Sequence, residues 1–275
     1  NKINEPSAGK AELSNTVIEI KIMTVINREI KKAVILAAGI GSRLRDIIDD
    51  RPKGLLIIDE KEIIKRSLDC LLDNGISEIV MVLGYLREKY IQELKTDYPQ
   101  IKYLQNPDYT STGSMHSLFL AKEHLSEDFL LLESDLLYED RCISSLLADP
   151  GDEAVLISGT TYSGDEVYVQ GESGLIQRIA KEKDPDLISQ GELVGISKIS
   201  TGLYEKMCDY YSQEIPFPSD YHYEDCLSDL AAKLSIRYLK IEDIIWTEID
   251  DPSHYHRAVE QIYPRIRSKE GLSNT

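Results

Sequence analysis

The sequence contains few cysteines, and no two of them lie close together. The four are Cys70, Cys142, Cys208 and Cys226. Because no CxxC pair occurs, the sequence argues against a zinc site and against the disulfide framework of a secreted protein. We therefore expect reduced thiols and a cytoplasmic location.

Long hydrophobic runs are also absent. No apolar stretch approaches the ~18 residues that a membrane span requires, and the first residues lack the basic and then apolar pattern of a secretory signal. The sequence predicts a soluble protein without a membrane span.

Positive charge is scarce. The chain has 31 lysine and arginine residues against 48 aspartate and glutamate residues, which gives a formal net charge of -17. An acidic surface argues against broad binding to nucleic acid, whose backbone is anionic. An anionic ligand must instead be held by a local cluster of cations or by a metal ion, so a cation beside a glycine-bearing loop becomes informative.

The length of 275 residues fits one large α/β domain. We place this domain at residues 32–263. The first stretch, residues 1–16, is polar and rich in small side chains, and residues 1–31 are predicted to be an N-terminal tail or extension. Residues 264–275 are predicted to be a C-terminal tail or linker. Such ends are compatible with fusion to another domain in a longer protein. The sequence gives no oligomeric state.

Short apolar runs without polar alternation predict buried strands at residues 33–38, 78–84 and 129–135. Between them, residues 62–75 and 85–98 have the apolar spacing of amphipathic helices, and the first of these ends on a glycine. Strands that alternate with helices predict an α/β fold with a Rossmann-like, doubly wound mixed sheet, whose ligands lie at the carboxyl ends of the strands.

After residue 150 the pattern changes to shorter strands and hairpin turns. These predict a small antiparallel β extension that forms one wall of a pocket. Helices are expected again near residues 200–212, 224–235 and 252–262.

The first predicted strand runs into the loop "LAAGIGSRL", residues 36–44. Gly39 and Gly41 match two glycines of a dinucleotide-binding G-x-G-x-x-G motif, but Leu44 occupies the third position. Asp59 could imitate the acidic residue that follows this motif and binds the ribose of NAD. The spacing of a triphosphate P-loop is absent. The backbone amides of this loop could wrap phosphates together with Arg43, although an isolated G-x-G more often marks a plain turn.

A second segment, "RPKGLL" at residues 51–56, brings Lys53 to the same end of the predicted sheet. The two segments at this spacing resemble the signature of the sugar-phosphate and related nucleotidyltransferases, and the resemblance runs from about residue 32 to 262. It implies a nucleotide-diphospho-sugar transferase-like fold in which the loop wraps a nucleoside triphosphate and Arg43 and Lys53 act catalytically by neutralising its phosphates. The implied nucleotide-binding residues are Leu36, Ala37, Ala38, Gly39, Gly41, Ser42, Arg43, Lys53 and, at the turn near the base, Gly84.

A reaction that joins two anions benefits from a divalent ion such as Mg²⁺. Asp135 ends one predicted strand, and Glu248 and Asp250 end another. Such aspartates commonly cap strands, and Asp250 or its neighbour could cap the helix that begins at Pro252. The resemblance implies Asp135 and Asp250 as the metal ligands. It leaves the roles of Glu133 and Glu248 open.

The stretch "STGSMHSL" opens a predicted helix whose hydroxyl groups suit a phosphate or phosphonate, although one of them can be a helix cap. It resembles the 2-aminoethylphosphonate cytidylyltransferases. The implied acceptor-binding residues are Ser111, Thr112, Ser114, Met115, Ser117 and Asp225. The last is expected to face the acceptor's ammonium group, although acidic residues at a helix start often only complement the helix dipole. No role is assigned to His116, His254 or His256.

The predicted reaction is therefore in-line attack of a 2-aminoethylphosphonate oxygen on the α-phosphorus of CTP, giving CMP-2-aminoethylphosphonate and pyrophosphate. The nucleophile is already an anion, so no general base is needed, and catalysis consists of positioning and charge neutralisation. The preference for CTP over UTP rests on the resemblance alone.

Three alternatives remain open. A phosphocholine or sugar-1-phosphate nucleotidyltransferase would share the loop and differ in its acceptor pocket. An NAD-dependent oxidoreductase would use the loop for a dinucleotide. A catalytically silent regulatory domain would share the fold, but the presence of both cations and both aspartates disfavours it.

Overall fold

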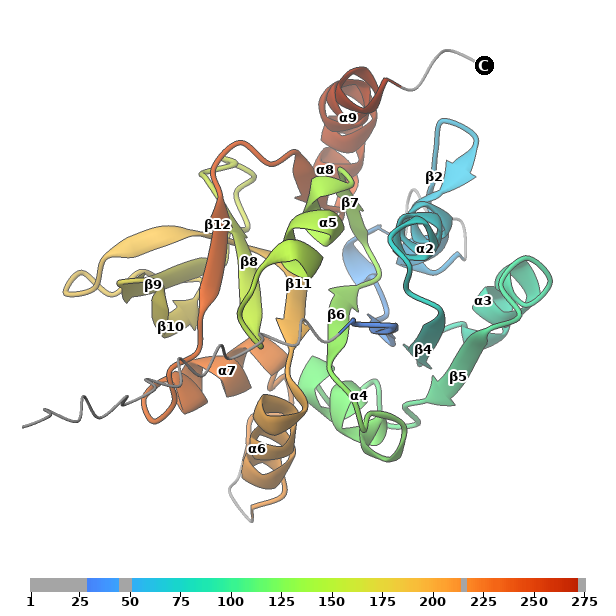
Figure 1. The fold of residues 1–275 in the computed structure, drawn as a ribbon. Coiled ribbons are helices and arrows are strands. Elements are labelled where there is room, and N and C mark those ends of the chain that lie inside the picture. Colours follow the sequence, from blue (N-terminus) through green and yellow to red (C-terminus); the bar gives the residue numbers. More distant parts are fainter. Residues whose placement is uncertain (1–28, 45–50, 214–216, 272–275) are drawn as a thin grey trace, which may run out of the picture.

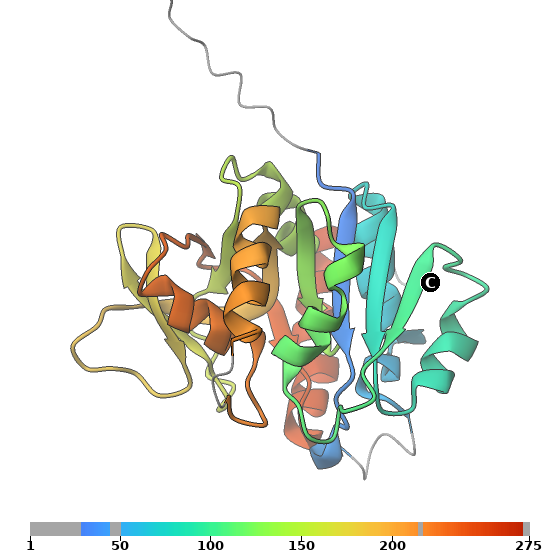
Figure 2. The ribbon, with the colours of Figure 1, turned by 90° about the horizontal axis from the view of Figure 1, so that it is seen from below.

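The computed structural model describes residues 29–44, 51–213 and 217–271. Four parallel strands form its centre, in the order β6-β1-β4-β5 (Figure 1). Buried side chains line β1 from end to end because helices cover both faces of the sheet (Figure 2). The strands are β1 (Lys32–Ala37), β4 (Glu78–Leu83), β5 (Ile101–Gln105) and β6 (Phe129–Glu133). They confirm the three strands predicted from apolar runs.

Two hydrophobic clusters separate the helices into two layers. One cluster holds the apolar faces of α2 (Ile63–Asp73), α3 (Arg87–Leu94) and α5 (Arg141–Ala148). The other holds those of α4 (Ser114–Leu120), α6 (Thr201–Tyr211) and α7 (Tyr223–Ala231). The sheet is therefore doubly wound, as the sequence pattern predicts.

The end of α2 shows how the sequence sets a boundary. Gly75 has φ +84°, a left-handed conformation that glycine adopts without strain. Its N–H donates to the Leu72 carbonyl at 2.9 Å, and the Ile76 N–H donates to the Leu71 carbonyl at 2.9 Å. These two bonds form a Schellman motif, which confirms the predicted glycine end of this helix.

The antiparallel extension is continuous with the central sheet. β11 pairs antiparallel with β9 near its start, with β6 over its last residues, and with β8 along most of its length, so it connects the core to the extension. Its antiparallel strands are β8 (Ala154–Ser158), β9 (Tyr168–Glu172), β10 (Leu175–Ala180) and β11 (Ser189–Ile199). A further strand, β12 (Tyr238–Ile241), pairs with β8 in parallel. This arrangement confirms the predicted extension.

Short elements complete the fold around the carboxyl ends of the parallel strands. They are the 3₁₀ turns η1 (Ser42–Leu44) and η2 (Lys53–Leu55), the hairpin β2 (Ile57–Ile58) and β3 (Lys61–Glu62), the pair β7 (Leu136–Tyr138) and β13 (Trp246–Glu248), and α8 (Pro252–Arg257), which continues through the π-helical turn η4 (Ala258–Ile262). The turn η3 (Lys122–His124) lies at the opposite end of the sheet, where the Lys32 ammonium donates to the His124 carbonyl at 3.3 Å. Asp251 caps α8 by accepting from the His254 N–H at 2.9 Å.

The C-terminal segment differs from the predicted tail or linker. Helix α9 spans Tyr263–Glu270, and Ile266 is 4% exposed. Lys269 in its last turn contacts the buried carboxylate of Glu139 at 3.1 Å. Few apolar residues anchor this helix, so its sequence reads as polar. Most of the predicted N-terminal tail, residues 1–28, lies outside the described residues.

Across residues 29–44, 51–213 and 217–271, no helix combines the length and the apolar character needed to cross a bilayer.

Candidate active site

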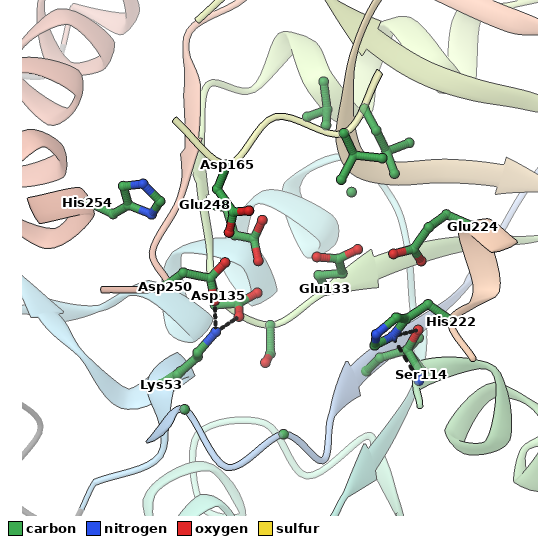
Figure 3. Close-up of a pocket in the computed structure, with 18 of the residues that line it drawn as sticks. Lys53, Ser114, Glu133, Asp135, Asp165, His222, Glu224, Glu248, Asp250 and His254 are labelled. Carbon is green, nitrogen blue, oxygen red and sulfur yellow. Dashed lines mark hydrogen bonds and ion pairs between the residues drawn. The ribbon is translucent and has the colours of Figure 1, made fainter. Parts of the chain in front are cut away.

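A pocket of about 350 Å³ opens at the carboxyl ends of β1 and β6. The loop after β1, the residues that follow β6, and parts of β11 and β13 form its walls. Figure 3 shows acidic side chains gathered around Lys53 in this pocket. This is the edge of a doubly wound sheet at which ligands bind.

Lys53 joins two strand ends at the centre of the pocket. It begins η2 after Pro52, and its Nζ contacts the Asp135 carboxylate at 2.9 Å and also the Asp250 carboxylate. Burial lowers the pKa of Lys53, but the two carboxylates outweigh it and hold the pKa above its ordinary value. Lys53 is therefore a charged ammonium group between two anions.

Arg43, in the loop after β1, contacts Asp250, one of the two carboxylates that Lys53 contacts. Its guanidinium contacts Asp250 at 3.2 Å and Asp165, in the segment between β8 and β9, at 3.2 Å. Burial raises the pKa of Asp250, but Lys53 and Arg43 outweigh this and hold it at about 2. Two cations from separate loops thus converge on one ionised carboxylate.

Three other carboxylates could hold a metal ion. One oxygen from each of Glu133, Asp135 and Glu248 lies within 4.8 Å of the others. Burial and the neighbouring acids raise the pKa of Glu133 and of Glu248 well above the ordinary range. An all-oxygen donor set of closely spaced carboxyl groups fits a hard divalent cation. Asp250, predicted as a ligand, instead contacts Lys53 and Arg43 here.

The glycine loop packs directly against the central lysine. Gly41 has φ +64°, and a Cβ at this position would lie 2.6 Å from Cγ of Lys53. Gly39 faces open space, with nothing within 4 Å of the point that a Cβ would occupy. A side chain at Gly41 would therefore collide with Lys53, and a side chain at Gly39 would occupy space in the pocket.

The structure divides the predicted nucleotide residues into two groups. The residues that line the pocket are Leu36, Ala38, Gly39, Gly41, Arg43 and Lys53. Ala37, Ser42 and Gly84 do not line it. Gly84 instead lies behind the loop, where a Cβ would approach the Ala38 carbonyl oxygen to 2.6 Å.

The predicted acceptor residues are also divided. Thr112, Ser114 and Ser117 line the pocket. Met115 is fully buried in the hydrophobic cluster beneath α4, and Ser111 is exposed outside the pocket and donates to the Asp108 carbonyl. Asn106 was not predicted. It is a buried residue after β5, and its amide donates to Thr112 at 3.1 Å and to Ser117 at 3.0 Å.

Asp225 lies outside the pocket, and its neighbour Glu224 lines it. The Asp225 carboxylate accepts from the backbone N–H of His222 at 2.8 Å and so caps α7. The prediction that Asp225 faces an ammonium group is not supported by this position. Glu224 is half-buried, and its Oε2 is a buried atom without a hydrogen-bond partner among the described residues. Two adjacent acids at a helix start could not be told apart without the orientation of the helix.

Of the histidines left without a role, His254 lines the pocket. Its Nε2 lies 3.3 Å from the Ser163 carbonyl oxygen. His116 instead packs on Tyr211, with ring centroids 6.1 Å apart. Asp59, which could have imitated a ribose-binding acid, accepts from the Tyr263 hydroxyl at 2.8 Å and does not line the pocket. The dinucleotide alternative therefore loses its acidic residue.

Comparison with known proteins gives a consistent result. The profile of a family described as nucleotidyl transferase matches residues 32–176, which is more than half of the chain. The CMP-5'-(3-aminopropyl)phosphonate synthase of Streptomyces rubellomurinus is 30% identical over 240 residues, which cover 82% of this chain. The chain spans only 38% of the length of that relative.

Two further relatives carry related names. The choline-phosphate cytidylyltransferase of Streptococcus pneumoniae is 25% identical over 83% of this chain and 97% of its own length. The 2-aminoethylphosphonate cytidylyltransferase of Lancefieldella rimae is 29% identical over 56% of this chain and 63% of its own length.

The fold also has a close counterpart among solved structures. The inositol-1-phosphate CTP transferase from T. maritima superimposes with a TM-score of 0.73 at 23% identity, covering 90% of this chain and 99% of that one. This likeness shows the nucleotide-diphospho-sugar transferase fold.

Proposed function

Because the chain belongs to the nucleotidyl transferase family, we propose that it is a cytidylyltransferase that joins CTP and 2-aminoethylphosphonate to give CMP-2-aminoethylphosphonate and pyrophosphate. The observation that carries the transfer chemistry is the convergence of Lys53 and Arg43 on Asp250 beside the glycine loop. Two cations at one rim offset the repulsion between an anionic acceptor and a triphosphate.

The residues of the chain act by position and charge. Arg43 and Lys53 bind the phosphates of the nucleotide, and the loop at Gly39 and Gly41 lets the backbone approach them. The phosphonate oxygen is already ionised at neutral pH, so it needs no base. The role of the chain is to hold that oxygen in line with the α-phosphorus and away from water.

Mg²⁺ is the cofactor that suits the acidic group. Asp135 and Glu248 would hold it, with Glu133 within reach, and Asp250 would join them when Lys53 and Arg43 engage phosphates. When bound, the ion neutralises charge on the triphosphate and the leaving pyrophosphate. The repulsion from neighbouring acids, which together with burial raises the pKa of Glu133 and of Glu248, supports this assignment.

The acceptor's amine is assigned to the flank of the pocket opposite Lys53. Glu224 lies there, beyond Glu133, whose carboxylate accepts from the Tyr223 hydroxyl at 2.7 Å (Figure 3). Both carboxyls have raised pKa values, because burial and neighbouring acids disfavour their charged forms. A primary ammonium group would supply the charge and the hydrogen-bond donor that the Oε2 atom of Glu224 lacks.

This flank favours a primary amine over the quaternary ammonium of phosphocholine. A quaternary group has no N–H to donate and is held best against aromatic faces. Tyr221 and Tyr223, the aromatic residues next to Glu224, are buried and do not line the pocket. The names of the relatives, which refer to CMP or cytidylyl transfer and to aminoalkylphosphonates, support the choice of base and acceptor.

The test is a grid of reactions read by pyrophosphate release. Each of CTP, UTP, ATP and GTP is combined with 2-aminoethylphosphonate, phosphocholine or glucose-1-phosphate in the presence of Mg²⁺. We expect the highest kcat/KM for CTP with 2-aminoethylphosphonate. A higher value for phosphocholine or for the sugar phosphate would replace the proposed acceptor, and the absence of pyrophosphate release in every combination would refute the transfer reaction.

A further inference from the structure

Tyr90 lies behind the pocket, between the segments that carry Lys53 and Asp135. It belongs to α3, and it is only 2% exposed although it lines the pocket. The N–H of Gly54, the residue after Lys53, donates to the Tyr90 hydroxyl at 3.0 Å. The side chain of Ser134, the residue before Asp135, interacts with the same hydroxyl and lowers its pKa.

The packing at Gly54 shows how tightly the segments meet. A Cβ at Gly54 would lie 2.7 Å from the Tyr90 hydroxyl and 2.9 Å from the Ser134 carbonyl oxygen. These separations are shorter than any ordinary carbon contact, so only glycine allows the η2 segment to approach both partners. Lys53 and Asp135 are thus each one residue from a contact with the same buried hydroxyl.

We propose that Tyr90 is a positioning residue that sets the separation of Lys53 and Asp135, and with it the geometry of phosphoryl transfer. The inference rests on the proposed function for the roles of those two residues. A buried phenol anchored in a rigid helix can align two loops more closely than their own short turns can, because its ring is fixed by the core around it.

The hydroxyl acts through its hydrogen bonds and not as a base. Burial raises the pKa of Tyr90 to about 12, and the bonds to Ser134 and Gly54 oppose this only in part. The group therefore stays protonated at neutral pH, where it can donate one hydrogen bond while accepting another.

The chain offers a matched control for removal of this hydroxyl. Tyr103, on β5, packs against the same hydrophobic cluster, and its hydroxyl is buried without a partner in the described part of the chain. Tyr90→Phe and Tyr103→Phe each delete one buried oxygen from this core. Only Tyr90→Phe deletes an oxygen that joins the two loops.

We expect Tyr90→Phe to lower kcat by about 10- to 100-fold, the scale of a small misplacement of catalytic groups. The KM values for CTP and the acceptor should change by less than about threefold, because the pocket walls remain. Tyr103→Phe should keep the wild-type kcat. In a crystal structure of Tyr90→Phe, the 2.9 Å contact between Lys53 and Asp135 should be lengthened.

A wild-type kcat for Tyr90→Phe, or an equal loss in Tyr103→Phe, would overturn the inference. If Tyr90→Phe does not fold, Gly54→Ala replaces it, because its methyl group would push η2 away from the intact tyrosine and should give the same selective loss of kcat. If no combination of substrates gives pyrophosphate release with the wild type, the proposed function fails. The crystal structure then decides alone: an unchanged Lys53–Asp135 contact overturns the inference, and a lengthened one supports it.

Discussion

Lys53 and Asp250 form an ion pair at the centre of the pocket although 197 positions separate them in the chain. Lys53 arrives on a turn after the glycine loop, and Asp250 follows β13 near the other end of the fold. The pair therefore exists only when the first and last parts of the domain are assembled. It also balances charge, because Asp250 would otherwise be a buried anion among other acids.

Replacement of Lys53 should impair both catalysis and stability. Lys53→Met keeps the length of the side chain but removes its charge, so the phosphates lose a cation and we expect kcat/KM to fall by at least about 100-fold. Asp135 and Asp250 would also lose their partner in a site where Lys53 is 15% exposed. We therefore expect the free energy of unfolding to fall by about 3 kcal/mol without Mg²⁺.

Denaturant unfolding with EDTA and with Mg²⁺ checks the second part. The ion should recover part of the lost stability, because it can replace the missing positive charge. Near-normal turnover of Lys53→Met would remove Lys53 from the proposed mechanism.

The central sheet could be predicted because buried parallel strands have a simple pattern. Uninterrupted apolar runs identify β1, β4 and β6, and the glycine at position 75 identifies the end of α2. The side chains of the site follow a different rule, because long-range packing decides which polar residues meet. Nothing near Asp165 in sequence indicates that it contacts Arg43, 122 positions away.

Adjacent acids at α7 show the same limit on a smaller scale. The sequence indicates an acidic helix start. Which of the two neighbours caps the helix (Asp225) and which lines the pocket (Glu224) depends on how α7 packs against the domain. Helix α9 was not predicted because its sequence has no apolar periodicity. Only Tyr263 and Ile266 are buried in it, and two residues are too few to produce a helical pattern.

Glu224 and Asp225 should differ sharply in their effect on the acceptor. Glu224→Gln removes the proposed charge partner of the ammonium group, so we expect the KM for 2-aminoethylphosphonate to rise by about 10- to 100-fold with little change in the KM for CTP. Asp225→Asn changes only a helix cap and should leave both KM values near those of the wild type.

Ethylphosphonate, which lacks the amine, provides the internal control for this pair. Steady-state kinetics should show similar, weak use of ethylphosphonate by the wild type and by Glu224→Gln. A raised KM for 2-aminoethylphosphonate in Asp225→Asn but not in Glu224→Gln would return the ammonium site to Asp225.

Asp135 should link nucleotide binding to Mg²⁺. Asp135→Asn removes one negative charge from the acidic group while preserving the shape of the side chain. We expect calorimetry to show that CTP binds the wild type more tightly as Mg²⁺ is added, and that this dependence is largely lost in the variant. An unchanged Mg²⁺ titration would contradict the assignment of Asp135 as a ligand.

Gly41 should be needed for more than its backbone conformation. Gly41→Ala strains a residue at φ +64° and also places a methyl group 2.6 Å from Cγ of Lys53, so we expect kcat to fall by about tenfold and stability by about 1 kcal/mol. Gly174→Ala is the control, because Gly174 has φ +81° with nothing within 4 Å. Its stability should fall by a similar amount without loss of kcat. Equal activity of the two variants would show that Gly41 serves the backbone alone.

Binding of Mg²⁺ should tighten as the pH rises. Burial, followed by repulsion from neighbouring carboxylates, raises the pKa of Glu133 and of Glu248 above the ordinary value. A carboxyl with a raised pKa keeps its proton to a higher pH, and a divalent ion must displace that proton to bind. Lowering the pH therefore favours the protonated form and weakens binding of the ion, whereas raising it has the opposite effect.

Calorimetry in two buffers with different ionisation enthalpies measures the protons released on Mg²⁺ binding. The wild type should release protons near neutral pH, and Glu133→Gln should release fewer, because one of the two titrating carboxyls is gone. Affinity that does not change as the pH is raised through neutrality, with no proton release, would show that these carboxyls are already ionised in the free protein. In that case the acidic group would hold its charge without a cation, and the physical reason for placing Mg²⁺ there would be lost.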